Sequence, residues 1–97
     1  MSRYRLSPRA QSDLRAIVAW YRKHRGAESA RKTLADIRGA LRRLAGEPGM
    51  GHVLELVASP DHLFWPHRHL WIVYLRDTRP LEVVTIWDAR RGDPPLA

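Results

Sequence analysis

The feature that most constrains this fold is an unbroken run of six apolar residues, Leu70 to Leu75. Successive side chains of a strand point to opposite faces of its sheet, so this run supplies apolar side chains to both faces. One face receives Leu70, Ile72 and Tyr74, and the other receives Trp71, Val73 and Leu75. We therefore expect a central strand over His69–Leu75 that is covered on both sides. The run is far shorter than the roughly 20 residues that a membrane-spanning helix needs.

Turn-forming residues divide the rest of the C-terminal half into further candidate strands. Val53–Val57 is the first, and Leu63–Trp65 is a brief second one. We expect that second strand to end at Pro66, because proline cannot donate to a central ladder. Asp77–Pro80 predicts a turn. Leu81–Trp87 follows at hairpin distance and is rich in β-branched and aromatic residues, which favours a long strand.

The N-terminal half shows helical spacing instead. A short candidate strand, Tyr4–Leu6, precedes Ser7 and Pro8, which are typical of the cap and the first position of a helix. Apolar residues then recur at steps of three and four, and Gly26 is typical of a helix end. The members of this apolar stripe are Ala10, Leu14, Ile17, Val18 and Tyr21.

A second helix is predicted to begin near Ala27 and to end at Gly46, Pro48 and Gly49. Its apolar residues alternate steps of four and three, which is typical of a seam against a neighbouring helix. These residues are Ala30, Leu34, Ile37, Leu41 and Leu44. Because the link between the two helices is very short, we expect an antiparallel helical hairpin.

The order of the elements predicts an α+β fold, in which the helical hairpin packs on one face of a small, mainly antiparallel sheet. We interpret residues 1–97 as a single domain with a basic, proline-rich tail over residues 89–97, since a chain of this length supports one modest core. The two helices cover one face of the sheet, and no predicted helix is left for the other. The second apolar face is therefore expected to be a partner site or to bury against a second copy.

Basic residues outnumber acidic residues by seventeen to ten, and fifteen of the seventeen are arginine. The net charge of +7 favours an anionic partner, such as nucleic acid, an acidic protein or a membrane surface. A GC-rich genome is a second explanation for the preference for arginine over lysine. The absence of cysteine excludes disulfides, thiolate zinc sites and thiol catalysis. The first residues contain no apolar segment followed by a small-residue cleavage site, so we expect no signal peptide.

The ordered set of elements resembles the RelE/ParE superfamily of toxins from bacterial type II toxin–antitoxin pairs. The residues that carry this resemblance extend over nearly the whole chain. They are Tyr4–Pro8, Ala10, Asp13, Leu14, Ala30, Pro48, Gly51, Trp71–Tyr74, Leu81–Trp87 and Ala89–Pro94. The resemblance implies a cytoplasmic toxin with no cofactor or metal. It also implies a cognate antitoxin that keeps the toxin silent, in a complex that is a heterotetramer or larger.

Two activities are known in this superfamily. ParE-like toxins block DNA gyrase, and RelE-like toxins cut mRNA on the ribosome. Many members carry histidine where this chain has Asp88, and that departure weakens the case for nuclease chemistry. We therefore favour a ParE-like inhibitor of gyrase. A ribosome-dependent mRNA endonuclease is the alternative, and a toxin-like fold without toxicity is the third interpretation.

Three histidines, His62, His67 and His69, lie close together around the start of the predicted central strand. His67 and His69 flank Arg68, and residues two apart on an extended segment share a face. These two imidazoles, with Arg68 and Arg90, are candidate groups for RNA cleavage, which needs a base, an acid and a cation. The better-supported interpretation is a solvated histidine-rich loop, because no positioning partner is visible. His67 and His69 could supply two ligands of a zinc site, but His62, His52 or Asp61 would have to fold back as the third, and we expect no metal.

Trp87 and Asp88 are followed by Arg90 and Arg91 where the last strand leaves the sheet. One interpretation is a target-binding patch, with Trp87 stacking on a base and Arg68 adding to the positive charge. In the other interpretation, Trp87 belongs to the core, Asp88 caps or pairs with an arginine, and the arginines are solvated. The sequence leaves both interpretations open.

Arg31, Arg38 and Arg42 lie along one side of the second helix. They form either a solvated helix face or a surface that meets an acidic antitoxin segment. Trp20 lies one position away from the apolar stripe of the first helix, and Trp71 lies on the second face of the sheet. Both tryptophans are therefore candidate anchors for an antitoxin, although core packing is the commoner fate of such residues.

Overall fold

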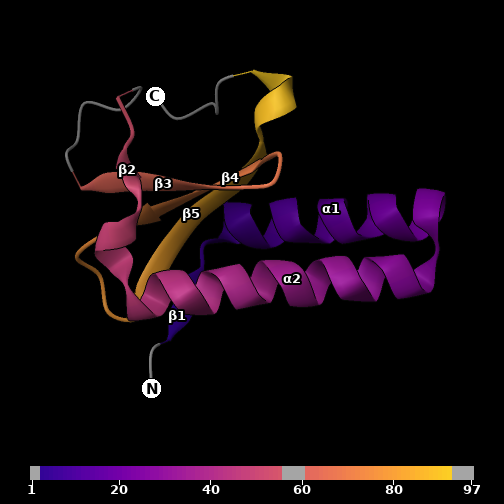
Figure 1. The fold of residues 1–97 in the computed structure, drawn as a ribbon, viewed down its shortest axis with the longest axis horizontal. Helices are drawn as coiled ribbons and strands as arrows, with labels where there is room; N and C mark the ends of the chain where they lie inside the picture. The colour runs from indigo at the N-terminus through magenta and orange to yellow at the C-terminus, as the bar shows by residue number, and fades with distance from the viewer. Residues whose placement is uncertain (1–2, 56–60, 93–97) are drawn as a thin grey trace.

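A computed structural model describes residues 3–55 and 61–92 of the 97-residue chain. The elements follow in the order β1 (Tyr4–Leu6), α1 (Pro8–Arg25), α2 (Ala27–Gly46), β2 (His52–Val53), β3 (His62–His67), β4 (Leu70–Leu75) and β5 (Leu81–Asp88), as Figure 1 shows. Short 3₁₀ turns over Pro48–Met50 and Ala89–Arg91 follow α2 and β5. Within the described residues, neither α1 nor α2 is both long enough and apolar enough to cross a membrane.

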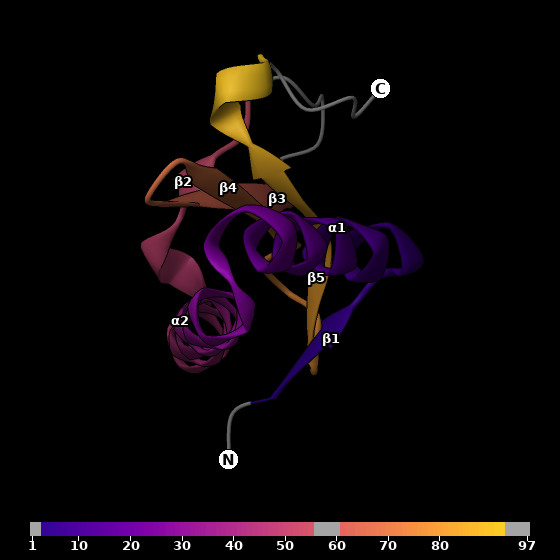
Figure 2. The same ribbon diagram turned by 90° about the vertical axis from the view of Figure 1, so that its right-hand side faces the viewer.

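The five strands form one sheet in the order β1-β5-β4-β3-β2. β1 runs parallel to β5, with Tyr4 beside Leu81, and the other described pairs are antiparallel. β4 therefore lies at the centre of the sheet, as its apolar run predicts. The helical hairpin covers one face of the sheet (Figure 2), and this arrangement confirms the predicted α+β fold.

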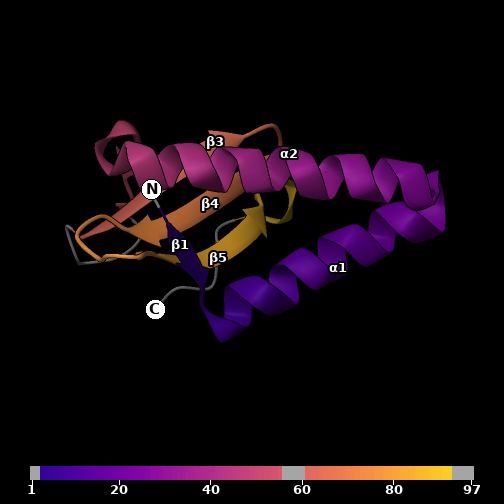
Figure 3. The same cartoon turned by 90° about the horizontal axis from the view of Figure 1, so that it is seen from below.

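The sequence between β1 and α2 explains where each helix begins. The Ser7 hydroxyl accepts the backbone N–H of Ala10 at 3.0 Å and donates to the Val84 carbonyl at 2.7 Å, which ties the start of α1 to β5. Gly26 separates the two helices with a φ of 94°, a conformation that favours glycine. This one-residue link turns α2 back along α1 (Figure 3), as the short connection predicts.

The core lies between the hairpin and the sheet. Leu41 and Leu44 of α2 join Ile72 of β4 and Val83 of β5 in one apolar cluster, and all four side chains are fully buried. The helical seam and the inner face of the central strand are therefore the two surfaces that fold together. Burial of this kind is the main source of stability in a small domain.

Tyr74 brings one polar group into this core, and the residues after α2 satisfy it. The Tyr74 hydroxyl donates to the Pro48 carbonyl at 2.6 Å and accepts the Gly51 N–H at 3.0 Å. A side chain on Gly51 would collide with this hydroxyl and would come within 2.9 Å of the Phe64 carbonyl. We call Pro48, Gly51 and Tyr74 the tyrosine clamp.

Two strand boundaries differ from those predicted. The strand expected over Val53–Val57 is shorter, because β2 pairs with β3 at His52 and Val53, and residues 56–57 lie outside the described part of the chain. β3 continues through Pro66 instead of ending there. Proline is tolerated at this point because β2 reaches only as far as Phe64, so β3 forms the edge of the sheet at Pro66.

The second face of the sheet is not the bare apolar surface that we expected. Val73 is fully buried, and Trp87 is only 9% exposed. The turn after β5 brings the Arg91 guanidinium to 4.6 Å from the centre of a Trp87 ring, and Phe64 stacks on Trp71 at 4.4 Å. The expectation was wrong because these apolar side chains cover one another. Within the described residues, the exposed large apolar side chains are Trp20 and Val53.

Candidate functional site

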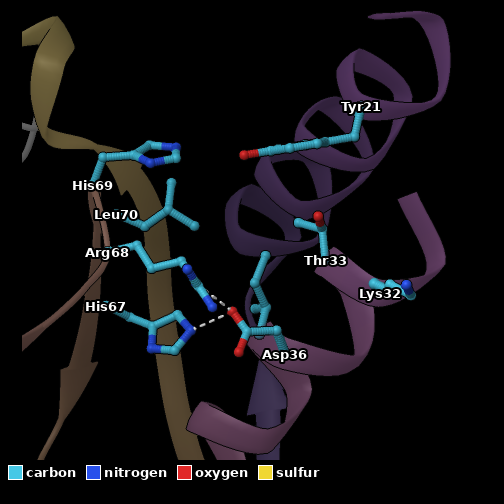
Figure 4. A pocket seen from close by; sticks show the side chains of 9 residues that line it. Tyr21, Lys32, Thr33, Asp36, His67, Arg68, His69 and Leu70 are labelled. Carbon is cyan, nitrogen blue, oxygen red and sulfur yellow. Dashed lines mark hydrogen bonds and ion pairs between the residues drawn. The ribbon is translucent and has the colours of Figure 1, made fainter. Parts of the chain in front are cut away.

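A cavity of about 420 Å³ opens between the helical hairpin and the turn that joins β3 to β4 (Figure 4). Its polar lining consists of basic side chains, two hydroxyls and one carboxylate. These residues are Tyr21, Lys32, Thr33, Asp36, His67, Arg68 and His69, and we call the cavity the turn pocket. Because α1, α2 and the turn all contribute, the fold assembles this site from segments that are distant in sequence.

Asp36 holds the β3–β4 turn to α2. Its Oδ2 atom accepts a hydrogen bond from His67 Nε2 at 2.8 Å and another from Arg68 Nε at 3.0 Å. The hydrogen bond from His67 lowers the pKa of Asp36 below its usual value, and Arg68 adds to this lowering against the opposing effect of burial. The ionised carboxylate therefore joins two segments that lie 31 positions apart.

Arg68 adopts a backbone conformation that arginine rarely takes. Its φ is 58°, and no other non-glycine residue in ranges 3–55 and 61–92 has a positive φ. His67 pairs with Leu70, so Arg68 and His69 form a two-residue turn between the strands. Turns of this length favour glycine, asparagine or aspartate where φ is positive. The ion pair with Asp36 helps to hold Arg68 in this unusual conformation.

A second cavity, of about 280 Å³, lies between the C-terminal half of α1 and the end of β5. Tyr21, His69 and Leu70 line both cavities, so the two are adjacent. Besides the shared residues, its charged and aromatic lining consists of Asp13, Trp20, Arg25, Asp88, Arg90 and Arg91, and we call it the β5-end pocket.

Asp88 fixes the position of Arg90 in the β5-end pocket. Its carboxylate accepts the Arg90 backbone N–H at 2.9 Å and the Arg90 Nη2 at 2.7 Å. These hydrogen bonds lower the pKa of Asp88 and raise that of Arg90. The side chain of Arg90 is nevertheless 68% exposed, so its guanidinium is available at the surface.

The four candidate nuclease residues line two adjacent cavities. His67, Arg68 and His69 line the turn pocket, and His69 also lines the β5-end pocket together with Arg90. The expectation of a solvated loop without a positioning partner was wrong at His67, because the Asp36 carboxylate accepts a hydrogen bond from this imidazole at 2.8 Å. Arg90 is paired with Asp88. In the described part of the chain, no group of three or more histidine, aspartate or glutamate side chains is arranged to hold a metal ion.

The candidate target-binding residues divide into two kinds. Arg68, Arg90 and Arg91 are exposed. Trp87 is nearly buried, and its Nε1 atom donates to the Gly92 carbonyl at 2.8 Å. The ring therefore supports the turn beneath Arg91 and is not free to stack on a base, and Asp88 is paired with Arg90.

The candidate antitoxin-binding residues lie on three different surfaces. Arg31, Arg38 and Arg42 line a groove of about 430 Å³ on the outer side of α2. Leu34 and Arg38 also line a neighbouring cavity of about 510 Å³ between the two helices. We call these two adjoining cavities the hairpin groove, and their apolar lining includes Leu14, Val18 and Leu34. The two tryptophans lie elsewhere, Trp20 in the β5-end pocket and half-buried Trp71 on the second sheet face.

Sequence reasoning missed Asp36 and Tyr21 as members of a site. No pattern in the sequence marks Asp36, and Tyr21 was interpreted only as part of the apolar stripe of the first helix. The unexplained histidines around Arg68 were the available signal, since a basic turn in a folded protein often has a carboxylate partner. No spacing in the sequence identifies which of the ten acidic residues that partner is.

Comparison with known proteins agrees with this architecture. A family model described as the ParE toxin of the type II toxin–antitoxin system parDE matches residues 4–92. No curated protein sequence matches the chain. A solved structure described as the chromosomal ParDE toxin–antitoxin system from P. aeruginosa has the same fold, with a TM-score of 0.75, 21% sequence identity, and coverage of 91% of this chain and 96% of that chain. The family match extends over nearly all of the described residues, and the chain therefore belongs to the ParE toxin family of type II toxin–antitoxin systems.

Proposed function

We propose that this toxin inhibits growth by binding DNA gyrase and that a cognate antitoxin neutralises it. The observation that carries the proposal is the ParE family match over residues 4–92, because ParE-like toxins act on gyrase. The presence of Asp88 where many members of the superfamily carry histidine also favours an inhibitor over a nuclease.

We assign target binding to the rims of the two adjacent pockets. Arg68 is exposed at the turn pocket, Arg90 and Arg91 are exposed at the β5-end pocket, and Trp20, which also lines the β5-end pocket, is 49% exposed. Arginine and tryptophan are the residue types that most often dominate the energetics of protein interfaces. Trp87 and Asp88 contribute indirectly, since they hold Arg91 and Arg90 in place.

We assign antitoxin binding to the hairpin groove. An apolar floor that includes Val18 and Leu34 lies beside the basic side chains of Arg31, Arg38 and Arg42. An amphipathic segment with acidic residues on one side would complement both features. The toxin and antitoxin would then form a heterotetramer or a larger complex.

A direct test adds the full chain to two reactions, gyrase supercoiling and translation scored for mRNA cleavage. We expect inhibited supercoiling and intact mRNA. Cleaved mRNA, together with loss of that cleavage in Arg68→Ala, would instead support the endonuclease. If neither reaction is affected and the chain is harmless when expressed without antitoxin, the fold has lost its toxicity.

A second test concerns the hairpin groove. The double variant Arg38→Glu/Arg42→Glu should remain toxic but escape neutralisation by the antitoxin, because two attractive charges become repulsive. Arg43→Glu is the matched control, since Arg43 is exposed on the same helix but does not line the groove. Equal neutralisation of the double variant and the wild type would refute this assignment.

A further inference from the structure

We propose that the turn pocket binds a phosphate group, with Arg68 as its main charged contact. The proposal concerns a ligand of the isolated chain, so it does not depend on the target of the toxin. The pocket belongs to neither the hairpin groove nor the buried core. The charged and hydrogen-bonding groups of its lining are the reason to consider a ligand.

The charges that line the pocket favour an anion. Arg68 carries a positive charge, and the imidazoles of His67 and His69 lie beside it, whereas Asp36 is the one acidic residue in the lining. Lys32 also lines the cavity, but it makes an ion pair with Glu28 at 3.7 Å. The cavity also lies within a chain of net charge +7, whose field adds to the local attraction. A volume of about 420 Å³ leaves space for a phosphate and for part of the molecule that carries it.

Asp36 shows that an anionic oxygen fits between the donors of the turn. His67 Nε2 and Arg68 Nε converge on a single carboxylate oxygen at 2.8 and 3.0 Å. The hydrogen bond that Arg68 makes within the described residues uses its Nε atom, so both Nη atoms remain for a second oxyanion. A guanidinium presents its donors in a planar fork and can therefore bind two oxygens at once.

Further donors face the same space from the helices. In Figure 4 the Tyr21 hydroxyl points across the pocket toward His69, and the Thr33 hydroxyl lies on the opposite wall from the turn. Neither hydroxyl has a hydrogen-bond partner in the part of the chain that the structure describes. Donors on two walls suit a tetrahedral phosphate, which presents oxygens in several directions, better than a planar carboxylate.

The positive φ of Arg68 is consistent with a binding role. A backbone φ of 58° is unfavourable for arginine in a turn where glycine would fit without strain. Strained residues of this kind cluster at sites where a side chain must be presented in one position. Here the turn presents Arg68 to the cavity, and its side chain is 71% exposed.

The test is an NMR titration of the full chain with inorganic phosphate, at constant ionic strength set with chloride. We expect saturable shifts confined to the amides around Arg68 and Thr33. Arg68→Gly keeps the turn conformation but removes the guanidinium, and it should weaken phosphate binding by about tenfold. Asp36→Asn keeps the hydrogen-bond acceptor but removes the competing charge, and it should strengthen binding.

Arg3→Gln is the matched control, because Arg3 lies beside the start of β5 at the opposite end of the sheet. This control should bind phosphate as the wild type does. A single-stranded DNA oligonucleotide identifies the source of the phosphate. If the oligonucleotide competes with inorganic phosphate for the turn pocket, the ligand is the backbone of a nucleic acid. If phosphate binds and the oligonucleotide does not compete, the ligand is free phosphate or a small phosphomonoester. Shifts that never saturate, or equal losses in Arg3→Gln and Arg68→Gly, would overturn the proposal.

Discussion

The core side of the sheet and the turn pocket use polar groups in opposite ways. In the core, Tyr74 is fully buried, and the Pro48 carbonyl and the Gly51 N–H satisfy its hydroxyl. In the turn pocket, Asp36 and Arg68 are partly exposed, and Arg68 has a strained backbone. A buried, satisfied hydrogen bond stabilises a fold, whereas an exposed ion pair contributes little. The contrast suggests that stability resides in the first region and that the second is free to serve binding.

The largest expected effect is in the core. Leu41→Ala removes a fully buried side chain from the seam between α2 and the sheet, and it should lower the free energy of unfolding by about 3 kcal/mol. Urea denaturation followed by circular dichroism measures this change. A loss below about 1 kcal/mol would mean that the seam is not the main source of stability.

The tyrosine clamp should show the next largest effect. Tyr74→Phe leaves the Pro48 carbonyl and the Gly51 N–H without their partner, which should cost about 1–3 kcal/mol in the same denaturation experiment. Tyr21→Phe is the matched control in the turn pocket and should change stability by less than about 0.5 kcal/mol. Equal losses in the two variants would remove the contrast between the regions.

Asp36 should have a smaller effect that depends on pH. Its pKa is lowered in the folded state, so its contribution is present above the unfolded pKa of about 3.9 and is lost as the pH falls through the lower folded value. Asp36→Asn should therefore be less stable than the wild type by about 0.5 kcal/mol at pH 7 and low salt. The difference should vanish in acid, and thermal unfolding between pH 7 and pH 2 tests this. A difference that persists at pH 2 would show that the role of Asp36 is not ionic.

The smallest net effect is expected for Arg68→Gly. The substitution loses an exposed ion pair but relieves the positive φ, and these two terms should cancel to within about 0.5 kcal/mol. Arg68→Ala also loses the ion pair, but alanine relieves less of the strain of the positive φ than glycine does. The alanine variant should therefore be less stable than Arg68→Gly by about 1 kcal/mol. If the alanine variant were as stable as the glycine variant, the turn would not be strained.

The regions also differ in how far the sequence predicts them. Regular spacing marks both helices, and the apolar run marks β4, because core burial repeats along the chain with the period of each element. The cap at Ser7 and the link at Gly26 follow from local backbone preferences. These features need no knowledge of distant contacts.

The turn pocket and the second sheet face depend on contacts between distant residues. Asp36 reaches His67 and Arg68 across 31 and 32 positions, and no local pattern specifies that pairing. The burial of Trp87 depends on a turn that brings Arg91 over the ring, so strand patterning alone led to the wrong expectation of a bare face. Pro66 was wrongly interpreted as the end of a strand. A proline is tolerated there only because β2 stops at the level of Phe64, and the sequence near Pro66 does not show where β2 stops.

The most direct test of this account compares gyrase supercoiling in the presence of the wild-type chain and of Arg68→Gly/Arg90→Gln. The substitutions remove exposed charge from the turn pocket and from the adjacent β5-end pocket, and neither changes a residue of the core. We predict that the variant keeps its midpoint of thermal unfolding and needs at least about tenfold more protein than the wild type to inhibit gyrase. Inhibition by the variant at the wild-type concentration, or no inhibition by the wild type, would contradict the account.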